Sequence, residues 1–226
     1  VASKLKILSS LCFNSFIDNN IHIEGINSID RIDIKNADIL GYKIKLLGFA
    51  ELIDNKVYQR VHPTLINNSS YIAGIDGVLN AVIINGEPVG ESIIQGEGAG
   101  PAATTSALVS DISSILRGNV KFPFSISSKE RKKLHFSNLK ERSFSAYLRF
   151  EVHDKPGVLS DITNIFSRNR VSIKRLIQNP NKSKKYSSIV IITHKSKDKF
   201  LNQIIRQTSQ KSYIKSKPKL IRINDN

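Results

Sequence analysis

The spacing of hydrophobic residues predicts a helix at the start of the chain, then a short helix and two strands. Residues 1–16 place apolar side chains on one side of a helix and Lys6, Ser10 and Asn14 on the other. DIKNADILG (33–41) predicts a helix closed by its glycine, YKIKLLGFAEL alternates like a strand, and VYQRVHPTLI follows as another. The apolar side of the first helix comprises Val1, Leu5, Leu8, Leu11, Cys12 and Phe16.

A hairpin and a longer helix are predicted next. VLNAVIING and PVGESIIQG flank Asn85 and Gly86, a dipeptide that accepts the positive φ angles of a tight turn. A glycine-rich stretch then leads into Pro101, which suits a first helical turn, and the helix is expected to end at Gly118. Its apolar stripe comprises Leu108, Val109, Ile112, Ile115 and Leu116.

The pattern changes from Ser145 onward. SAYLRFEV alternates as a strand, HDKPG predicts a turn, and VLSDITNIFSR has helical spacing. Two further strands (VSIKRLIQ and SSIVIITH), a helix (KFLNQIIRQTSQ) and a last strand (PKLIRIN) follow. The order βαββαβ is the ferredoxin-like arrangement. We therefore expect an α/β and α+β protein in which each half has its own core.

Composition sets the class of protein. A chain of 226 residues that is 40% hydrophobic can bury one large core or two smaller ones. No run approaches the roughly 18 apolar residues of a membrane span, and the single Cys12 suits a reducing compartment, which indicates the cytoplasm. The chain has no methionine and opens on a helical pattern without a leader, so we expect a fragment of a longer protein.

The formal charge of +15 raises the question of a nucleic-acid partner. Much of the excess lies in the run 127–142 and in KSKPK near the end, rather than along one face of a helix or sheet. This distribution favours a solvated basic surface over a polyanion site. The five histidines are scattered without the spacing of metal ligands, so no metal site is predicted, and His62 beside Pro63 is expected to be a satisfied residue at a strand end.

Two features could carry chemistry. Lys4 falls with Leu8 and Leu11 on the predicted apolar side of the first helix, where an ammonium either snorkels to solvent or is held beside a reacting group. Periodicity alone favours snorkelling. Glycines 96, 98 and 100 do not complete a dinucleotide fingerprint, because Pro101 occupies the position of its third glycine. They indicate either a tight turn or a place where a ligand approaches the backbone.

The first half nevertheless resembles a known family. VASKLKIL, DIKNADILGYKIKLLGFAEL, RVHPTLI and IDGVLNAVIINGEPVGESIIQGEGAGPAATTSALVSDI are similar, in order and spacing, to the catalytic domain of homoserine dehydrogenases. The resemblance covers nearly all of residues 1–118. It implies a mixed-sheet domain for substrate binding and dimerisation, preceded in the family by a nucleotide-binding Rossmann domain. The implied reaction is reversible reduction of aspartate 4-semialdehyde to homoserine with NADH or NADPH.

The resemblance also implies roles for individual residues. Lys4 falls on the catalytic lysine of the family, although the aspartate that precedes this lysine by four positions there has no counterpart in the chain. Gly98 and Gly100 fall on the wall beside the nicotinamide of the cofactor. Whether the cofactor is NAD or NADP is not readable from these residues, and the chain is expected to be inactive alone.

The second half resembles an ACT domain, a module that senses amino acids, over about residues 145–224. The resemblance implies that an effector binds at the turn before the first helix, and an end product such as threonine is the expected effector. Exposed N–H groups at the helix start could hold its carboxylate, although a plain turn explains the same residues. The effector-binding residues are expected to be Asp154, Gly157, Val158 and Leu159.

These interpretations give a catalytic and dimerisation domain at 1–118, a basic linker at 119–144 and an ACT regulatory domain at 145–226. The expected protein is a cytoplasmic homodimer or tetramer that binds a small substrate and an amino-acid effector, without nucleic acid or membrane. One alternative is a non-catalytic, amino-acid-sensing protein that keeps the dimer core and the ACT domain. A third, weaker hypothesis is polyanion binding through 127–142.

Overall fold

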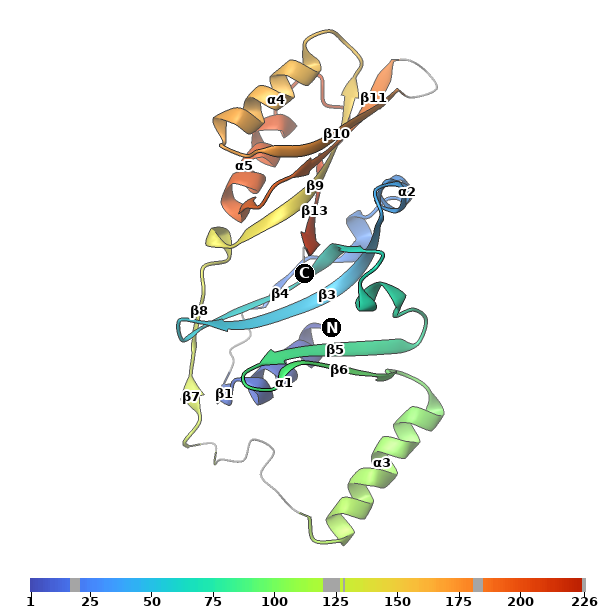
Figure 1. Ribbon diagram of the computed structural model, residues 1–226, viewed down its shortest axis with the longest axis vertical. Helices are drawn as coiled ribbons and strands as arrows, with labels where there is room; N and C mark the ends of the chain where they lie inside the picture. Colours follow the sequence, from blue (N-terminus) through green and yellow to red (C-terminus); the bar gives the residue numbers. More distant parts are fainter. Residues whose placement is uncertain (17–20, 120–126, 128, 181–184, 225–226) are drawn as a thin grey trace.

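The computed structural model describes residues 1–16, 21–119, 127, 129–180 and 185–224 (Figure 1). Helices and strands alternate through the first half, in agreement with the expected mixed unit. Its elements are α1 (Ala2–Cys12), β1 (Ser15–Phe16), β2 (His22–Ile23), η1 (Ile26–Ser28), α2 (Arg31–Ile39), β3 (Tyr42–Ile53), β4 (Lys56–Asn67), η2 (Tyr71–Gly74), β5 (Leu79–Gly86), β6 (Gly90–Glu97) and α3 (Pro101–Leu116).

The second half has the predicted βαββαβ order. Strand β9 is followed by α4, β10, β11, α5 and β13, and the periodicity of their sequences explains each element. The elements of this half are β7 (Lys132–Lys133), β8 (His135–Phe136), η3 (Leu139–Glu141), β9 (Ser143–His153), α4 (Val158–Arg168), β10 (Ile173–Pro180), β11 (Tyr186–Thr193), β12 (Ser196–Lys197), α5 (Asp198–Ser209) and β13 (Lys219–Asn224).

One sheet of nine strands runs through both halves. Its main path is β10-β11-β9-β13-β4-β2, with β3 and β8 also paired to β4 and β12 to β9. The joint between the halves is the parallel pairing of β13 with β4, in which Arg222 lies opposite Thr64 and Ile223 opposite Leu65. Figure 1 shows this joint where the red end of the chain meets the cyan strands. The ferredoxin-like sheet is therefore extended by the strands of the first half.

The expectation of a separate core in each half is wrong. One cluster lies within the second half, where α4 and α5 cover one face of β9 and β11 around Phe150, Ile162 and Leu201. A second cluster joins the halves, because Ala37 of α2 and Leu65 of β4 pack with residues of β9, β11 and β13. The residues from these three strands are Tyr147, Val190, Ile192, Ile221 and Ile223.

The buried face of α1 differs from the predicted one. Leu5 and Ser9 are buried, Lys4 is exposed, and Leu11 keeps 42% of its surface. The helix is oriented by what lies beneath it, because a Cβ on Gly48 of β3 would be 3.3 Å from Leu5, and the amide of Gln59 donates to Ser9 Oγ. The predicted polar face was also wrong at Ser10, which is 8% exposed.

The turn of the β5–β6 hairpin lies further along the chain than predicted. Asn85 and Gly86 are still in β5, paired with Glu91 and Gly90, so residues 87–89 form the turn. Gly90, with φ of +77°, supplies the left-handed conformation that was assigned to Gly86. A proline in this loop fixes its backbone more strongly than the Asn-Gly pair does.

Helix α3 starts at Pro101 and is followed by Gly118 (φ +74°), as predicted. In Figure 1 it stands apart from the sheets, at the end of the chain's green segment. Its apolar stripe is solvent-exposed, from 56% at Val109 and Ile112 to 82% at Leu116. A helix of this length gains most of its stability from packing, so the exposed stripe is a surface suited to contact with another protein segment.

Part of the expected linker is ordered by short pairings. β7 runs parallel to β1, and β8 runs parallel to the start of β4. Residues 120–126 and 128 of that segment lie outside the described residues. Two-residue strands have no periodicity, so the sequence could not indicate them.

Candidate functional site

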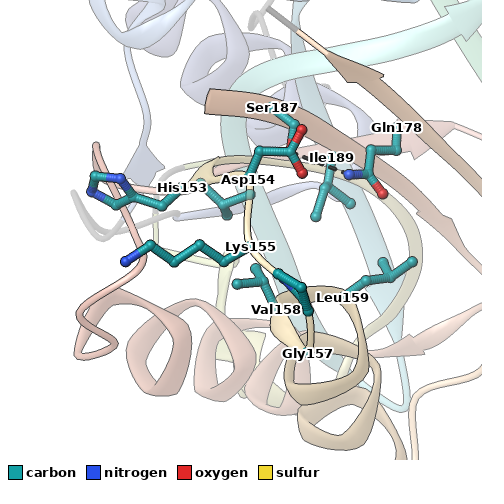
Figure 2. A pocket seen from close by; sticks show the side chains of 11 residues that line it. His153, Asp154, Lys155, Gly157, Val158, Leu159, Gln178, Ser187 and Ile189 are labelled. Carbon is teal, nitrogen blue, oxygen red and sulfur yellow. Dashed lines mark hydrogen bonds between the residues drawn. The ribbon is translucent and has the colours of Figure 1, made fainter. Parts of the chain in front are cut away.

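A cavity of about 310 Å³ lies where β9 turns into α4 (Figure 2). The four residues predicted to bind an effector, Asp154, Gly157, Val158 and Leu159, all line it. The prediction missed the opposite wall, which comes from β10 and β11. That wall comprises Gln178, Ser187 and Ile189, and Val152, His153, Lys155 and Pro156 complete the lining.

The start of α4 presents backbone donors to this cavity. Gly157 has φ of +88°, a conformation that an L side chain rarely adopts, and it places α4 directly after the turn. The N–H of Val158 donates to Lys155 O at 3.3 Å, and that of Asp161 donates to Gly157 O at 2.9 Å. Since an α-helix leaves its first N–H groups without intrahelical acceptors, Leu159 supplies the backbone donor expected at this cavity. Val158, predicted as a donor, instead contributes a wall.

The remaining lining is polar at the rim and apolar at the base. Gln178 Nε2 donates to Ser187 Oγ at 3.3 Å, and Val152 and Ile189 are buried beneath them. Figure 2 shows Asp154, Ser187 and Gln178 on one side of the cavity and the start of α4 on the other. A helix N-terminus favours an anion and an aspartate favours a cation, so this arrangement suits a small zwitterion such as an amino acid.

Lys4 and the glycine turn come from different elements. Lys4 lies on the exposed side of α1, which packs on β3, whereas Gly98 and Gly100 connect β6 to α3. The structure thus gathers the predicted effector residues in one cavity, whereas the predicted catalytic and cofactor residues lie on different elements.

The two glycines differ in what surrounds them. A Cβ on Gly98 would lie 1.6 Å from Asn80 Nδ2, so a side chain there would require the exposed Asn80 amide to move. Gly100 has φ of +125° and nothing within 4 Å of an added Cβ. Gly100 therefore fits a wall that a flat ring could approach closely, while the space in front of Gly98 is filled by the protein itself.

A buried charged cluster, not predicted from the sequence, lies at the joint between the halves. Arg222 of β13 donates to Asp198 Oδ1 at 2.8 Å and to Glu24 Oε2 at 2.9 Å, and Arg60 of β4 also donates to Glu24. Burial alone would raise the pKa of Glu24, but Arg222 and Arg60 outweigh it and lower this pKa to about 2. Hydrophobic periodicity gave no signal for it, because these residues lie far apart in sequence.

His62 borders the same cluster. It lies within β4 rather than at its end, and its Nδ1 is 2.9 Å from Pro63 O and 3.1 Å from Thr64 Oγ1. Burial, together with Arg222 and Arg60, lowers its pKa to about 4. Its ring is stacked on Phe49 at 5.2 Å, so His62 is a neutral core residue in this fold.

Two family models match the chain. One, described as homoserine dehydrogenase, covers residues 1–113, and the other, described as ACT domain, covers residues 146–208. The chain belongs to the homoserine dehydrogenase family. Both the resemblance and the fold class inferred from the sequence are thereby confirmed.

Relatives and a solved structure agree with this assignment. A homoserine dehydrogenase of Neisseria gonorrhoeae is 36% identical over 89% of this chain and 48% of its own length, and one of Helicobacter pylori is 34% identical over 99% and 53%. The crystal structure of a homoserine dehydrogenase from Thiobacillus denitrificans aligns with a TM-score of 0.87 at 33% identity, over 99% of this chain and 52% of that one. The chain spans about half the length of these relatives.

Two further observations concern the described residues of this family member. No helix among them is long and apolar enough to cross a membrane. They also contain no group of three or more histidine, cysteine, aspartate or glutamate side chains placed to hold a metal ion.

Proposed function

We propose that this chain is the substrate-binding and regulatory part of a cytoplasmic homoserine dehydrogenase. The full-length enzyme would reversibly reduce L-aspartate 4-semialdehyde to L-homoserine with NADH or NADPH, and an amino acid would inhibit it through the ACT domain. The observation that carries the proposal is the agreement with the family along both halves of the chain. The test is an assay of the full-length protein for oxidation of NADH or NADPH that depends on aspartate 4-semialdehyde.

In this proposal Lys4 acts on the aldehyde oxygen. A bound nicotinamide cofactor would supply hydride chemistry at the aldehyde carbon. Lys4 Nζ–H would donate a proton to the aldehyde oxygen as it becomes an alkoxide. Packing of Leu5 on Gly48 and of Ser9 against Gln59 fixes the position of α1 and, with it, of Lys4. Exposure of Lys4 in this structure leaves its ammonium free to meet a substrate.

Gly100 is the residue of this chain that best fits the cofactor. Replacing Gly100 by valine in the full-length enzyme should raise the KM for the cofactor and lower kcat, because the side chain would fill the open space and strain a backbone at φ +125°. Gly96→Val is the matched control, since Gly96 also has nothing within 4 Å but lies in β6 with an ordinary backbone. If the two variants have equal KM for the cofactor and equal kcat, Gly100 shapes the turn and does not contact the cofactor.

We propose threonine as the effector, because an end product of the route that uses homoserine is an informative signal. The cavity at Asp154 and the start of α4 would hold its ammonium and carboxylate groups. Coupling between an effector site and an active site typically changes affinity by about 5- to 150-fold.

Gly157→Val should abolish threonine binding to the chain, since the branched side chain is strained at φ +88° and narrows the entrance between Asp154 and α4. Isothermal titration calorimetry checks this result. Gly118→Val, which places the same side chain at φ +74° far from the cavity, is the control and should bind normally. If the wild-type chain gives no heat with threonine, isoleucine, methionine or lysine, the ACT domain is an assembly element only.

Assembly into a homodimer is part of the proposal. The exposed stripe of α3 and the half-exposed apolar side chains of the β5–β6 hairpin support it, because patches of this kind mark interfaces. We propose no nucleic-acid or membrane partner.

A non-catalytic amino-acid sensor is the second candidate. It is favoured by one observation, that the predicted effector residues share a cavity. Reduction of aspartate 4-semialdehyde by the full-length protein would exclude it.

A further inference from the structure

Arg149 of β9 reaches from the ACT sheet to the first half of the chain. Its Nε–H donates to Asp33 Oδ1 at 2.6 Å and its Nη2 to Asp33 Oδ2 at 3.1 Å, while Nη2 also lies 2.7 Å from Asp30 Oδ2. The side chains of Arg149 and Asp33 are only 2% and 0% exposed. A bidentate arginine–carboxylate pair that is shielded from solvent is strong, and it fixes the relative orientation of the two side chains.

Asp33 joins this contact to the N-terminus of α2. Its Oδ1 also accepts from Tyr147 Oη at 3.0 Å, and its Oδ2 accepts from the backbone N–H of Asp30 at 3.1 Å, which closes a capping box. Asn36 Nδ2, one turn further along, donates to Tyr147 Oη at 3.1 Å. Together these residues form the Arg149 cluster: Arg149, Tyr147 and Glu151 of β9 with Asp30, Asp33 and Asn36 at α2.

Strand β9 connects this cluster to the cavity. Arg149 Nη1 donates to Glu151 Oε1 at 2.7 Å, and the backbone O of Glu151 accepts from Lys215 N at 2.8 Å. Two residues later, His153 N donates to Tyr213 O at 2.8 Å, and Asp154 follows at the cavity. Arg149 is thus about 13 Å along one strand from the cavity lining at His153.

On its other side, α2 contacts β3. Gly48 of β3 lies beneath Val1 and Leu5 of α1, each 3.3 Å from an added Cβ. Helix α2 therefore lies between the strand that leads to the cavity and the strand that supports the helix of Lys4. In Figure 1 it lies at the start of β3.

We propose that the Arg149 cluster is the connection through which a ligand in the cavity at Asp154 acts on α2 and β3. This inference rests on the proposed effector function. A ligand can act in this way only if it binds one arrangement of β9 and α2 better than another. The fork of Arg149 on Asp33 fixes the direction in which β9 meets α2, so a movement of β9 is passed to α2 through this contact.

Hydrogen–deuterium exchange on the 226-residue chain, with and without saturating L-threonine, tests the proposal. In the wild type, threonine should slow amide exchange around the cavity and also in residues 31–39. We expect a factor of about five or more, the lower end of typical coupling between two sites. Calorimetry on the same samples records binding itself.

Arg149→Lys is the decisive variant, because lysine keeps the charge but cannot form the fork. We expect it to bind threonine with nearly wild-type affinity and to show slowed exchange only within residues 143–224. Lys199→Met, which removes an exposed pair with Glu141 at 2.8 Å, is the control and should behave as wild type. If Arg149→Lys does not fold, Tyr147→Phe removes one donor to Asp33 and should weaken the effect on α2.

The outcomes separate the two proposals. Slowed exchange of α2 that persists in a folded Arg149→Lys chain overturns the role of the cluster and leaves effector binding intact. The role of the cluster is also overturned if threonine binding releases heat but does not slow amide exchange in α2 of the wild type. No heat with threonine in the wild type overturns the effector proposal, and this inference with it.

Discussion

Replacing Lys4 by alanine is expected to lower the turnover number of the full-length homoserine dehydrogenase by about 100-fold or more, the usual scale of acid catalysis. The loss would fall on kcat, since the proton is needed as the alkoxide forms and not when the substrate binds. The thermal midpoint should stay close to that of the wild type, because Lys4 is exposed and its removal leaves no cavity. Steady-state kinetics in both directions, together with a melting curve, check both parts.

Lys6→Ala is the matched control for this experiment, because Lys6 lies on the same helix two positions away and faces a different direction. It should retain most of the activity. A Lys4→Ala enzyme that turns over as fast as Lys6→Ala would remove Lys4 from the chemistry.

The second half of the fold could be predicted from the sequence almost completely. Each of its helices carries a clear apolar face, as Ile162 and Phe166 show in α4, and β11 contains a run of apolar residues. The turn at Gly157 is local as well, because glycine is the residue that best accepts its φ of +88°. Four of the residues that line the cavity could therefore be named from one short stretch.

Features that depend on tertiary pairing could not be predicted. Gln178 and Ser187 reach the cavity only through the register of β10 on β11, and nothing in their local sequence marks them. The face of α1 was misjudged because Gly48 and Gln59, which come from other elements, decide which side is buried. The core shared by the two halves could not be predicted for the same reason. A hydrophobic pattern shows that one face of an element is buried, but not which other element covers it.

The buried arginines that join the halves illustrate this limit and carry the last prediction. Arg222, with 2% of its side chain exposed, lies between Asp198 and Glu24. Arg222→Ala would leave these carboxylates with Arg60, and Glu24 also with His22 at 3.1 Å. Breaking a buried ion pair by removing one partner costs about 3–5 kcal/mol, so we expect the free energy of unfolding at pH 7 to fall by that amount. Arg206→Ala, on the exposed side of α5, should change it by less than about 0.5 kcal/mol.

The dependence of this loss on pH identifies its cause. Because the pKa of Glu24 is lowered from 4.5 to about 2 in the folded protein, its stabilising contribution is complete above pH 4.5 and disappears as the pH falls towards 2. Without Arg222 the folded pKa of Glu24 moves back towards 4.5, so the stability difference between wild type and Arg222→Ala should narrow between pH 5 and pH 3. The pKa of His62, lowered to about 4 chiefly by burial, makes both proteins less stable as the pH falls from 6.5 towards 4. Because Arg222 contributes to this lowering, the pKa of His62 rises in Arg222→Ala, and His62 therefore narrows the stability difference in the same direction as Glu24. Urea unfolding across this range measures the difference, and a gap that stays constant would mean that Arg222 stabilises the joint by packing rather than through the carboxylates.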